Sequence, residues 1–282
     1  MGRYLIAGEI SNAGKLWVVD DSSLEVLSTI DVTQDDDMTG VVYIPTIDRY
    51  ILNDRFGRIF SYSLANGTLT QQHRLNESST NFDDLTYDSV RDRLITTGQR
   101  TGGSTRYMYE YSYSVASGFR RTLRDTVPGQ TGLGFNFSYS PRGLAYISGD
   151  SPKLHVYNGS STTTDFILEF TPRTYDVNSP VKYRTVSDRS AATMTYNPDL
   201  QRSIVLSAGQ IKQFSATAYG NPSNTANLPT ALRATGVILR GISWTPDPTP
   251  EGFNHLRAGV AYNKVIRGGV TYNKAFRGGV AY

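Results

Sequence analysis

Short apolar segments alternate with polar turns along most of this chain, and one arrangement of them recurs. An apolar–x–aromatic segment is followed by a polar turn, often with Pro or Asp, and then by a second short apolar segment. The instances are VVYIPTIDRYILND from Val41, LTYDSVRDRLITTG from Leu85, FSYSPRGLAYISGD from Phe137 and MTYNPDLQRSIVLSAG from Met194, with aromatic anchors at Tyr43, Tyr87, Tyr139 and Tyr196. The instances lie roughly 50 residues apart, which is the period of a propeller blade of four strands.

Each unit is predicted to contain four strands. The second strands are the most continuously apolar, as expected of strands covered on both faces, and we place them at Tyr4–Ala7, Tyr50–Leu52, Leu94–Ile95, Leu144–Ile147 and Ile204–Leu206. Third strands alternate apolar with polar residues and begin at Lys15, Arg58, Tyr107, Lys153 and Ile211. Fourth strands begin at Glu25, Thr68, Phe119 and Asp165, and the fourth strand of the last unit is indistinct.

The order of these strands predicts how the ring closes. The chain begins on a second strand at Tyr4, and after the last unit it carries a lone first strand, Gly241–Trp244. Pairing the two would complete a blade and leave no open edge. The sequence therefore predicts an all-β, five-bladed β-propeller over residues 1–246. A six-bladed ring, with tail segments supplying the missing strands, is the structural alternative.

Composition agrees with a β protein and narrows the partners. Charged residues make up only 19% of the chain, and 19 Tyr and 11 Phe supply bulky core material. The net charge of +3 indicates no general affinity for nucleic acid, and no apolar run is long enough to span a membrane. Cysteine is absent, which excludes disulfides and thiolate metal sites. The first residues lack a signal peptide's apolar stretch, so we expect synthesis in the cytoplasm.

A proline-rich linker, residues 247–256, separates the propeller from a tail of ten-residue repeats, RAGVAYNKVIRGGVTYNKAFRGGVAY, at 257–282. Because the period is even, an extended ribbon would place its large apolar residues on one face: Val260, Tyr262, Ile266, Val270, Tyr272, Phe276, Val280 and Tyr282. A single ribbon cannot bury them. Three tails winding into a short β-fibre would cover them, and so would strand addition to a partner. A disordered end is the remaining interpretation, although the regular tyrosines argue against it.

Candidate chemistry is sparse, and we predict no catalytic, cofactor-binding or metal-ligating residue. The three histidines, His73, His155 and His255, have no metal-ligand spacing. Acidic residues precede several inner strands: Asp35, Asp36 and Asp37, then Asp83 and Asp84, and Asp176. Loops at these places reach one mouth of a propeller channel, where carboxylates could bind calcium or hydrolyse glycosides. Asp before a strand is also an ordinary turn residue, and this interpretation is favoured.

Four tyrosines share one face of a predicted third strand: Tyr107, Tyr109, Tyr111 and Tyr113. If exposed, they would form a stacking surface for sugars. If buried, they would pack one blade on the next, which is favoured because Tyr fills space well. Tyr109, Tyr111 and Tyr113, together with Asp83 and Asp84, are the candidate ligand-binding residues.

The Gly-Val-x-Tyr-Asn repeats of the tail resemble those at the ends of minor tail proteins of tailed bacteriophages. The likeness covers about 26 residues, at 257–282, and supplies no functional residues. It implies a non-enzymatic virion protein, assembled in the host cytoplasm, at the tail tip or in a tail fibre. Its partners would be other tail proteins, further copies of itself (a trimer is favoured) and a host-surface glycan. The alternatives are a glycan-active or lactonase-like propeller enzyme and a lectin-like module.

Overall fold

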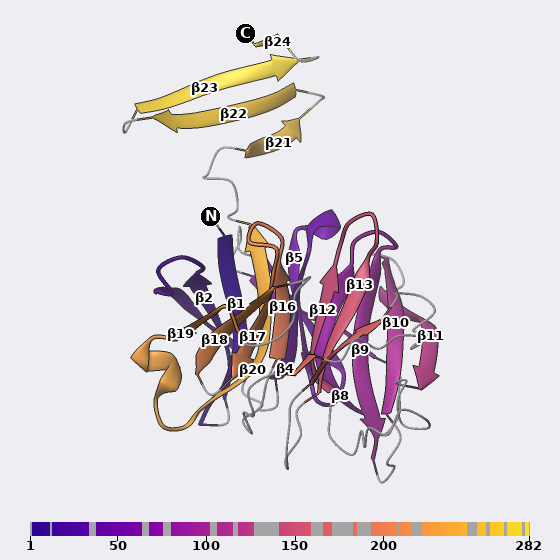
Figure 1. Cartoon of the computed structure of the whole chain (residues 1–282). Coiled ribbons are helices and arrows are strands. Elements are labelled where there is room, and N and C mark those ends of the chain that lie inside the picture. Colours follow the sequence, from indigo (N-terminus) through magenta and orange to yellow (C-terminus); the bar gives the residue numbers. More distant parts are fainter. Residues whose placement is uncertain are drawn as a thin grey trace.

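The structure is a computed structural model, and its description covers these backbone ranges: 2–11, 13–33, 38–63, 68–75, 80–101, 106–114, 118–126, 141–158, 166–170, 183–184, 193–207, 209–215, 222–246, 253–257, 260–267, 270–277 and 280–281. Five four-stranded antiparallel sheets form the blades of a β-propeller (Figure 1). The predicted all-β class and the five blades are confirmed.

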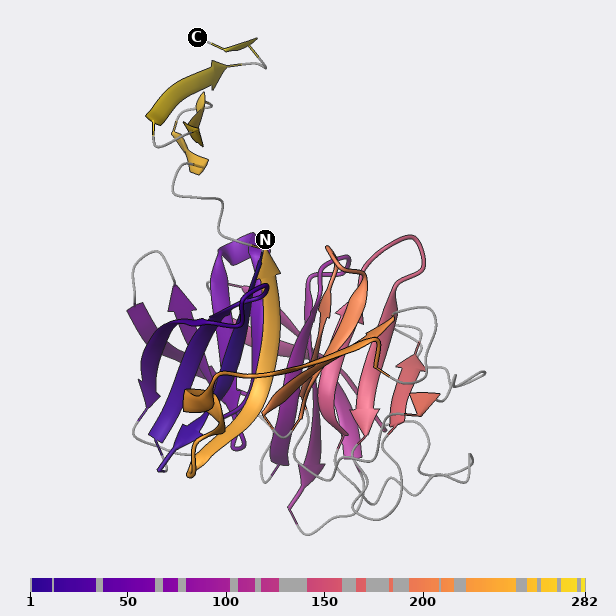
Figure 2. The ribbon, with the colours of Figure 1, turned by 60° about the vertical axis from the view of Figure 1, so that its left-hand side comes forward.

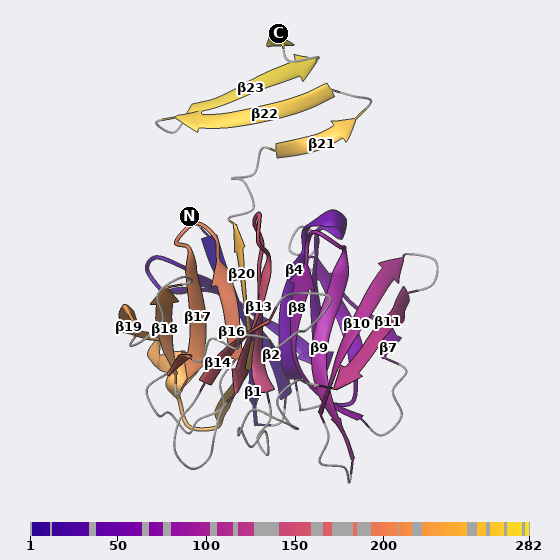
Figure 3. The same cartoon turned by 45° about the vertical axis from the view of Figure 1, so that its right-hand side comes forward.

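Each blade is numbered by its place in the ring, and its strands run from the inner strand outward. Blade 1 consists of β20 (Val237–Pro246), β1 (Gly2–Ile10), β2 (Ala13–Asp20) and β3 (Val26–Thr33). Blade 2 consists of β4 (Met38–Ile44), β5 (Arg49–Asp54), β6 (Arg58–Ser63) and β7 (Thr68–Arg74). Blade 3 consists of β8 (Thr80–Asp88), β9 (Arg93–Arg100), β10 (Arg106–Ser114) and β11 (Gly118–Thr126), which Figure 3 shows in order from the middle of the molecule to its edge.

The last two blades have shorter outer strands. Blade 4 consists of β12 (Pro141–Ile147), β13 (Lys153–Asn158), β14 (Phe166–Phe170) and β15 (Tyr183–Arg184). Blade 5 consists of β16 (Thr193–Asn197), β17 (Arg202–Ser207), β18 (Gln210–Ser215) and β19 (Asn224–Asn227). Two short 3₁₀ turns, η1 (Pro45–Ile47) and η2 (Thr230–Arg233), lie between strands. The inner strands pack on one another in the cycle β20, β4, β8, β12, β16 and back to β20.

The ring closes as the strand count predicted. β20 pairs antiparallel with β1, with Gly2 opposite Pro246 and Tyr4 opposite Trp244. Figure 2 shows the indigo β1 beside the orange β20 from the other end of the domain. Trp244 also reaches across blade 1, and its Nε1 donates to Asp21 Oδ2 at 2.9 Å. The described tail strands pair with one another and not with a blade, so they do not build the sixth blade of the alternative.

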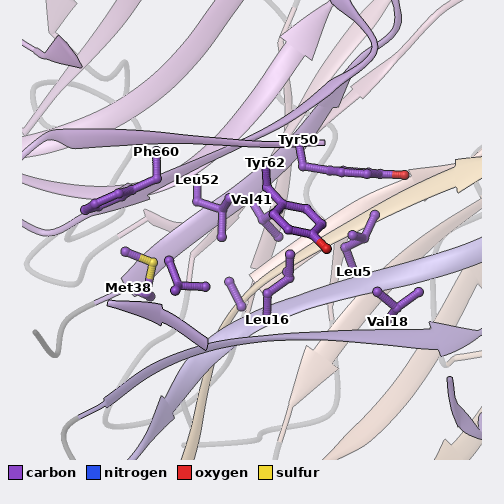
Figure 4. Packing of buried hydrophobic residues seen from close by; sticks show 11 residues of the cluster. Leu5, Leu16, Val18, Met38, Val41, Tyr50, Leu52, Phe60 and Tyr62 are labelled. Carbon is purple, nitrogen blue, oxygen red and sulfur yellow. The ribbon is translucent and has the colours of Figure 1, made fainter. Parts of the chain in front are cut away.

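Apolar side chains fill the spaces between blades. Between blades 1 and 2, Leu5, Leu16 and Val18 face Val41 and Leu52, and each is at most 1% exposed (Figure 4). Burial of each such side chain contributes about 1.5–3 kcal/mol. The second strands need apolar residues on both faces because both faces are covered by neighbouring blades. That explains why the middle of β1, Tyr4–Ala7, has no charged residue.

The strand order predicted for blade 4 is wrong by one strand. The segment placed second, Leu144–Ile147, belongs to the inner strand β12, so β13 is the second strand and β14 the third. The anchor of this blade is Tyr146, which pairs with Leu154 as Tyr87 pairs with Leu94 in blade 3. The proposed anchor, Tyr139, lies outside the described residues. Two successive segments, FSYS and LAYI, both have the apolar–x–aromatic pattern, so the pattern alone did not distinguish them.

The tail forms a sheet of its own. Its strands are β21 (Phe253–Arg257), β22 (Val260–Arg267), β23 (Val270–Arg277) and β24 (Val280–Ala281), in the order of the chain. A β-forming tail is therefore confirmed, but it folds back as an antiparallel meander and not as one extended ribbon. β21 begins inside the segment predicted to be linker, so the tail starts earlier than residue 257.

This meander changes which positions share a face. Paired residues of antiparallel strands lie on the same face. Arg267 pairs with Val270, and Tyr262 with Ala275, so equivalent positions of successive repeats occupy opposite faces of the sheet. The single face predicted for the tail is therefore wrong: the positions of Val260, Tyr262 and Ile266 lie opposite to those of Val270, Tyr272 and Phe276. Only two residues lie between the paired Arg267 and Val270, so these two positions share a face of the sheet. In one straight strand, residues three apart would lie on opposite faces.

Candidate functional site: the axis of the ring

Two positions recur in every inner strand at fixed distances from the aromatic anchors Tyr43, Tyr87, Tyr146, Tyr196 and Trp244. The residues directly before the anchors are Val42, Thr86, Ala145, Thr195 and Ser243, from blade 2 round to blade 1. The residues three before the anchors, which we call the axial residues, are Gly40, Asp84, Gly143, Thr193 and Gly241. Both sets lie along the inner edge of the blades, where no further strand pairs.

Hydroxyl groups of the first set bind the inner strand of the following blade. Thr86 Oγ1 accepts from Tyr146 N at 3.0 Å, between blades 3 and 4. Thr195 Oγ1 accepts from Trp244 N at 3.1 Å, and Ser243 Oγ accepts from Tyr43 N at 3.3 Å. Each bond satisfies a backbone donor that the inner edge of a sheet would leave without a strand partner. The side chains therefore align adjacent blades along the axis.

We expect the loss of one of these hydroxyls to weaken the ring modestly. Thr195→Val keeps the shape of the side chain but leaves Trp244 N without its acceptor, which costs about 1–2 kcal/mol. Urea unfolding of the variant and the wild type measures the difference. Thr195→Ser is the matched control, because it keeps the hydroxyl acceptor. Unchanged stability of Thr195→Val would mean that water or another group replaces the acceptor.

Asp84 occupies the centre of the axis. It is 0% exposed, its Oδ1 accepts from Leu85 N at 2.8 Å, and its Oδ2 accepts from Leu144 N at 3.1 Å. Thr193 Oγ1 of blade 5 donates to the same Oδ2 at 2.6 Å and itself accepts from Ile242 N of blade 1 at 3.2 Å. One carboxyl group thus connects blades 3, 4 and 5, and through Thr193 it reaches blade 1.

The electrostatics of Asp84 are dominated by its burial. Burial raises the pKa of Asp84 well above the usual value of a carboxyl group, and the hydrogen bonds from Thr193, Leu85, Leu144 and Met194 act in the opposite direction. Three of the other axial residues are glycines, and the space beside them is already filled. A Cβ atom on Gly40 would lie 2.6 Å from Leu85 N, and one on Gly143 would lie 2.7 Å from Met194 N. The axis at this level is packed with backbone and Asp84.

The predicted acidic site does not assemble around Asp84. Its carboxyl group is enclosed by backbone donors, so it is closed to a ligand from solvent. Asp83, beside it on β8, is half-buried, and its carbonyl oxygen accepts from Asn53 Nδ2 at 3.0 Å. Asp35, Asp36, Asp37 and Asp176 lie outside the described residues. Among the residues that the structure does describe, no three His, Cys, Asp or Glu side chains are grouped as metal ligands.

The tyrosine face belongs mainly to the core. Tyr109 is 0% exposed and Tyr111 is 1% exposed, and their rings lie in the cluster between blades 2 and 3. Tyr109 packs on Phe82 with ring centroids 5.6 Å apart. A sugar-stacking role for Tyr109 and Tyr111 is therefore wrong for this structure. Tyr113 is half-buried and packs on Phe119, with centroids 4.8 Å apart.

A buried polar group at the seam of blades 4 and 5 was not predicted from any sequence pattern. His155 is 0% exposed, its Nδ1 lies 3.2 Å from Ser203 Oγ, and its Nε2 lies 3.2 Å from Glu169 Oε2. Burial lowers the pKa of His155, which favours its neutral form, and the hydrogen bond to Glu169 acts in the opposite direction. Burial acts to raise the pKa of Glu169, but hydrogen bonds from His155 and Lys153 lower it to about 2. Ser203 is also 0% exposed, so this Ser–His–Glu arrangement cannot reach a substrate.

For the tail, the structure gives the backbone pairing described above, and the side chains lie outside the described residues. Those predicted to mediate docking or oligomerisation, Val260, Tyr262, Ile266, Val270, Tyr272, Phe276, Val280 and Tyr282, keep that role as a prediction. None of the helical segments in the described ranges has the length and apolar character that crossing a bilayer requires.

Comparison with known proteins supports the fold and goes no further. No protein-family model matches the chain, and no curated protein matches it. Among solved structures, a chain of the nidogen–laminin complex has a TM-score of 0.52 and 10% identity, covering 86% of this chain and 98% of that one. A Bacteroides caccae protein of unknown function has a TM-score of 0.47 and 8% identity, covering 93% of this chain and 82% of that one. At this identity the first likeness indicates a shared fold alone.

Proposed function

We propose that the protein is a non-enzymatic structural component of a bacteriophage tail, which displays its propeller at the tail tip or on a tail fibre. The observation that carries the proposal is the tail: a decapeptide repeat, similar to the repeats of phage minor tail proteins, in which every repeat is one strand of a sheet separate from the propeller. The propeller would serve assembly or contact with the host surface.

The pairing within the tail supports a role in association. Successive repeats pair antiparallel from Ala261 opposite Phe276 to Arg267 opposite Val270, so each repeat is complementary to the next. A strand that pairs with a near-copy of itself in its own chain can pair in the same way with a repeat of another copy. The register also distributes the Val and Tyr positions over both faces of the sheet. Covering both faces requires neighbours, which further copies or other tail proteins would supply.

The closed axis supports a structural role over an enzymatic one. Asp84, the best-placed carboxyl group, is used in joining blades and has no path to a substrate. The two central tyrosines are likewise used in packing. Asp84, Tyr109 and Tyr111, three of the five candidate ligand-binding residues, therefore hold the ring together.

The proposal is tested first by the mass of the protein in solution. We expect the full chain to form oligomers, with a trimer favoured, and a chain of residues 1–246 to be a folded monomer. Light scattering coupled to size exclusion measures both. Monomers in both cases would rule out self-association, and docking on another tail protein would then be the surviving form of the proposal.

The second test concerns the particle. We expect mass spectrometry of purified virions to detect this chain, and antibody labelling in electron micrographs to place it at the end of the tail. A particle that lacks the chain, although the chain is made during infection, would contradict the proposed function whatever its oligomeric state.

A further inference from the structure

A second buried polar group faces the axis beside Asp84. Asn53 of β5 is 0% exposed, and its Nδ2 donates to the carbonyl oxygen of Asp83 at 3.0 Å. Because the carbonyl oxygen of Asp83 can only accept a hydrogen bond, the end of the Asn53 side-chain amide that faces it must be the nitrogen. The other end, Oδ1, is a buried acceptor that no described donor reaches. An acceptor left in this state destabilises the fold, so the missing donor needs an explanation.

A candidate for that donor is the carboxyl group of Asp84, which borders the same small volume. A Cβ atom on Gly40 would lie 2.7 Å from Asn53 Oδ1 and 2.9 Å from Asp84 Oδ1. Both oxygens therefore border one small volume beside Gly40, which has no side chain to separate them. Two acceptor oxygens in such a place repel each other unless a proton lies between them, and an ionised carboxylate has no proton to give.

Burial, and not a nearby charge, favours the neutral form of Asp84. Residues that contact it from other strands are Gly40, Leu144, Thr193 and Met194, and none of them is titratable. On its own strand the titratable neighbours are Asp83 and Asp88, and on β5 the neighbour of Asn53 is Asp54, which is bonded to Arg58. Asp54 is paired with Arg58 and Asp88 with Arg91, so the neighbouring charges are largely balanced, and it is the burial of Asp84 that disfavours its ionised form.

We propose that Asp84 carries a proton in the folded ring and donates it to Asn53 Oδ1, so that one neutral carboxyl group joins the inner strands of blades 3, 4 and 5 to blade 2. Oδ2 remains the acceptor for Leu144 N and Thr193 Oγ1, and Asn53 Oδ1 gains its missing donor. The buried position, which raises the pKa of Asp84, is consistent with this state. The inference does not depend on whether the protein belongs to a virion.

The proposal makes the ring a pH-sensitive device. An unfolded Asp has its ordinary pKa near 4, so between that pH and the raised pKa the folded protein holds one proton more than the unfolded protein. In this window the contribution of Asp84 to stability falls as the pH rises, and it is fully present below the pKa of the unfolded chain. Above the raised pKa, the ionised carboxylate of Asp84 has no proton to donate to Asn53 Oδ1, and blades 2 and 3 lose this connection.

The first test compares urea unfolding of the wild type and Asp84→Asn from pH 5 to pH 9.5. We expect the unfolding constant of the wild type to rise, relative to that of Asp84→Asn, by up to tenfold per pH unit within the window. Asp83→Asn is the matched control and should follow the wild type. Parallel profiles of the wild type and Asp84→Asn would overturn the proposal.

The second test starts from the wild type, so it does not depend on a variant that folds. Infrared difference spectra of the full-length wild type, recorded against pH, should contain the carbonyl stretch of a protonated carboxylic acid at pH 7, and the band should disappear at alkaline pH. In Asn53→Ala, which removes the acceptor, the band should shift in frequency and disappear at a lower pH. Absence of the band at pH 7 would show that Asp84 is ionised, and a band unaffected by Asn53→Ala would show that Asn53 is not its acceptor.

Discussion

A chain that ends at Gly236 is expected to fail to form a cooperatively folded ring, whereas a chain that ends at Pro246 is expected to fold. The ten residues between these two ends are β20, the inner strand of blade 1. Without them β1 loses one of its two strand partners along its whole length, from Gly2 to Ile10, and becomes an edge strand. The apolar edge thus exposed is also a site for aggregation.

The loss is large because β20 contributes to three blades. Ile242 is 1% exposed in the cluster between blades 5 and 1, and its burial contributes about 1.5–3 kcal/mol. Its backbone N–H binds Thr193 of blade 5, and Ser243 binds Tyr43 of blade 2. Each of these hydrogen bonds contributes about 1 kcal/mol. With the paired backbone of β1 added, the sum approaches the whole stability of a domain, about 5–15 kcal/mol.

Circular dichroism in the near ultraviolet and urea titration measure the outcome. The shorter chain should lack tertiary signal or unfold in a broad transition, and the chain that ends at Pro246 should give one steep transition. Addition of a synthetic peptide with the sequence of residues 237–246 should restore part of the signal. A cooperative transition in the shorter chain without the peptide would mean that four blades and a partial fifth suffice.

Closure could be predicted from the sequence because it depends on counting strands. A domain that starts on a second strand and ends on a first strand, Gly241–Trp244, has one economical way to close, and an apolar run such as Tyr4–Ala7 indicates burial on both faces. The inner strand of blade 4 could not be assigned in this way. Two segments there share the aromatic pattern, and only the pairing of Tyr146 with Leu154 decides between them.

The axis could not be predicted, because its determinants are small residues with many meanings. Thr86 and Thr195 look like ordinary strand residues, and Asp84 looks like the end of a turn. The register of the inner strands shows that these residues share a position, one or three residues before an anchor. A search for Gly, Ser, Thr or Asp at that distance from each aromatic anchor would have found them, although with the wrong anchor in blade 4 it would have missed Gly143.

The glycines of the axis lead to the second large effect. We expect Gly143→Ala and Gly241→Ala each to destabilise the protein by about 3 kcal/mol, the upper part of the range for overpacking. A Cβ atom on Gly241 would lie 2.8 Å from Gly40 Cα, and one on Gly143 would lie 2.7 Å from Met194 N. Both neighbours are backbone atoms of the next inner strand, so they cannot move aside as a flexible side chain does. A single methyl group must therefore separate two blades.

Gly236→Ala distinguishes this effect from the general cost of replacing glycine. Gly236 has a φ of +86°, and no atom lies within 4 Å of the place that the methyl group of an alanine would take. Alanine there suffers only backbone strain, which costs about 1 kcal/mol. Urea unfolding of the three variants separates the two causes.

If the axial variants lose no more stability than Gly236→Ala, the inner strands can move apart by a few tenths of an ångström without loss. The hydrogen bonds from Ile242 N to Thr193 Oγ1 and from Tyr43 N to Ser243 Oγ would then be too weak to hold the ring at this spacing. If the axial variants lose the larger amount, the spacing of the inner strands is set by backbone contact, between β12 and β16 at Gly143 and between β20 and β4 at Gly241. Alanine at Gly241 then works against the contact that β20 makes with blade 2 when it closes the ring.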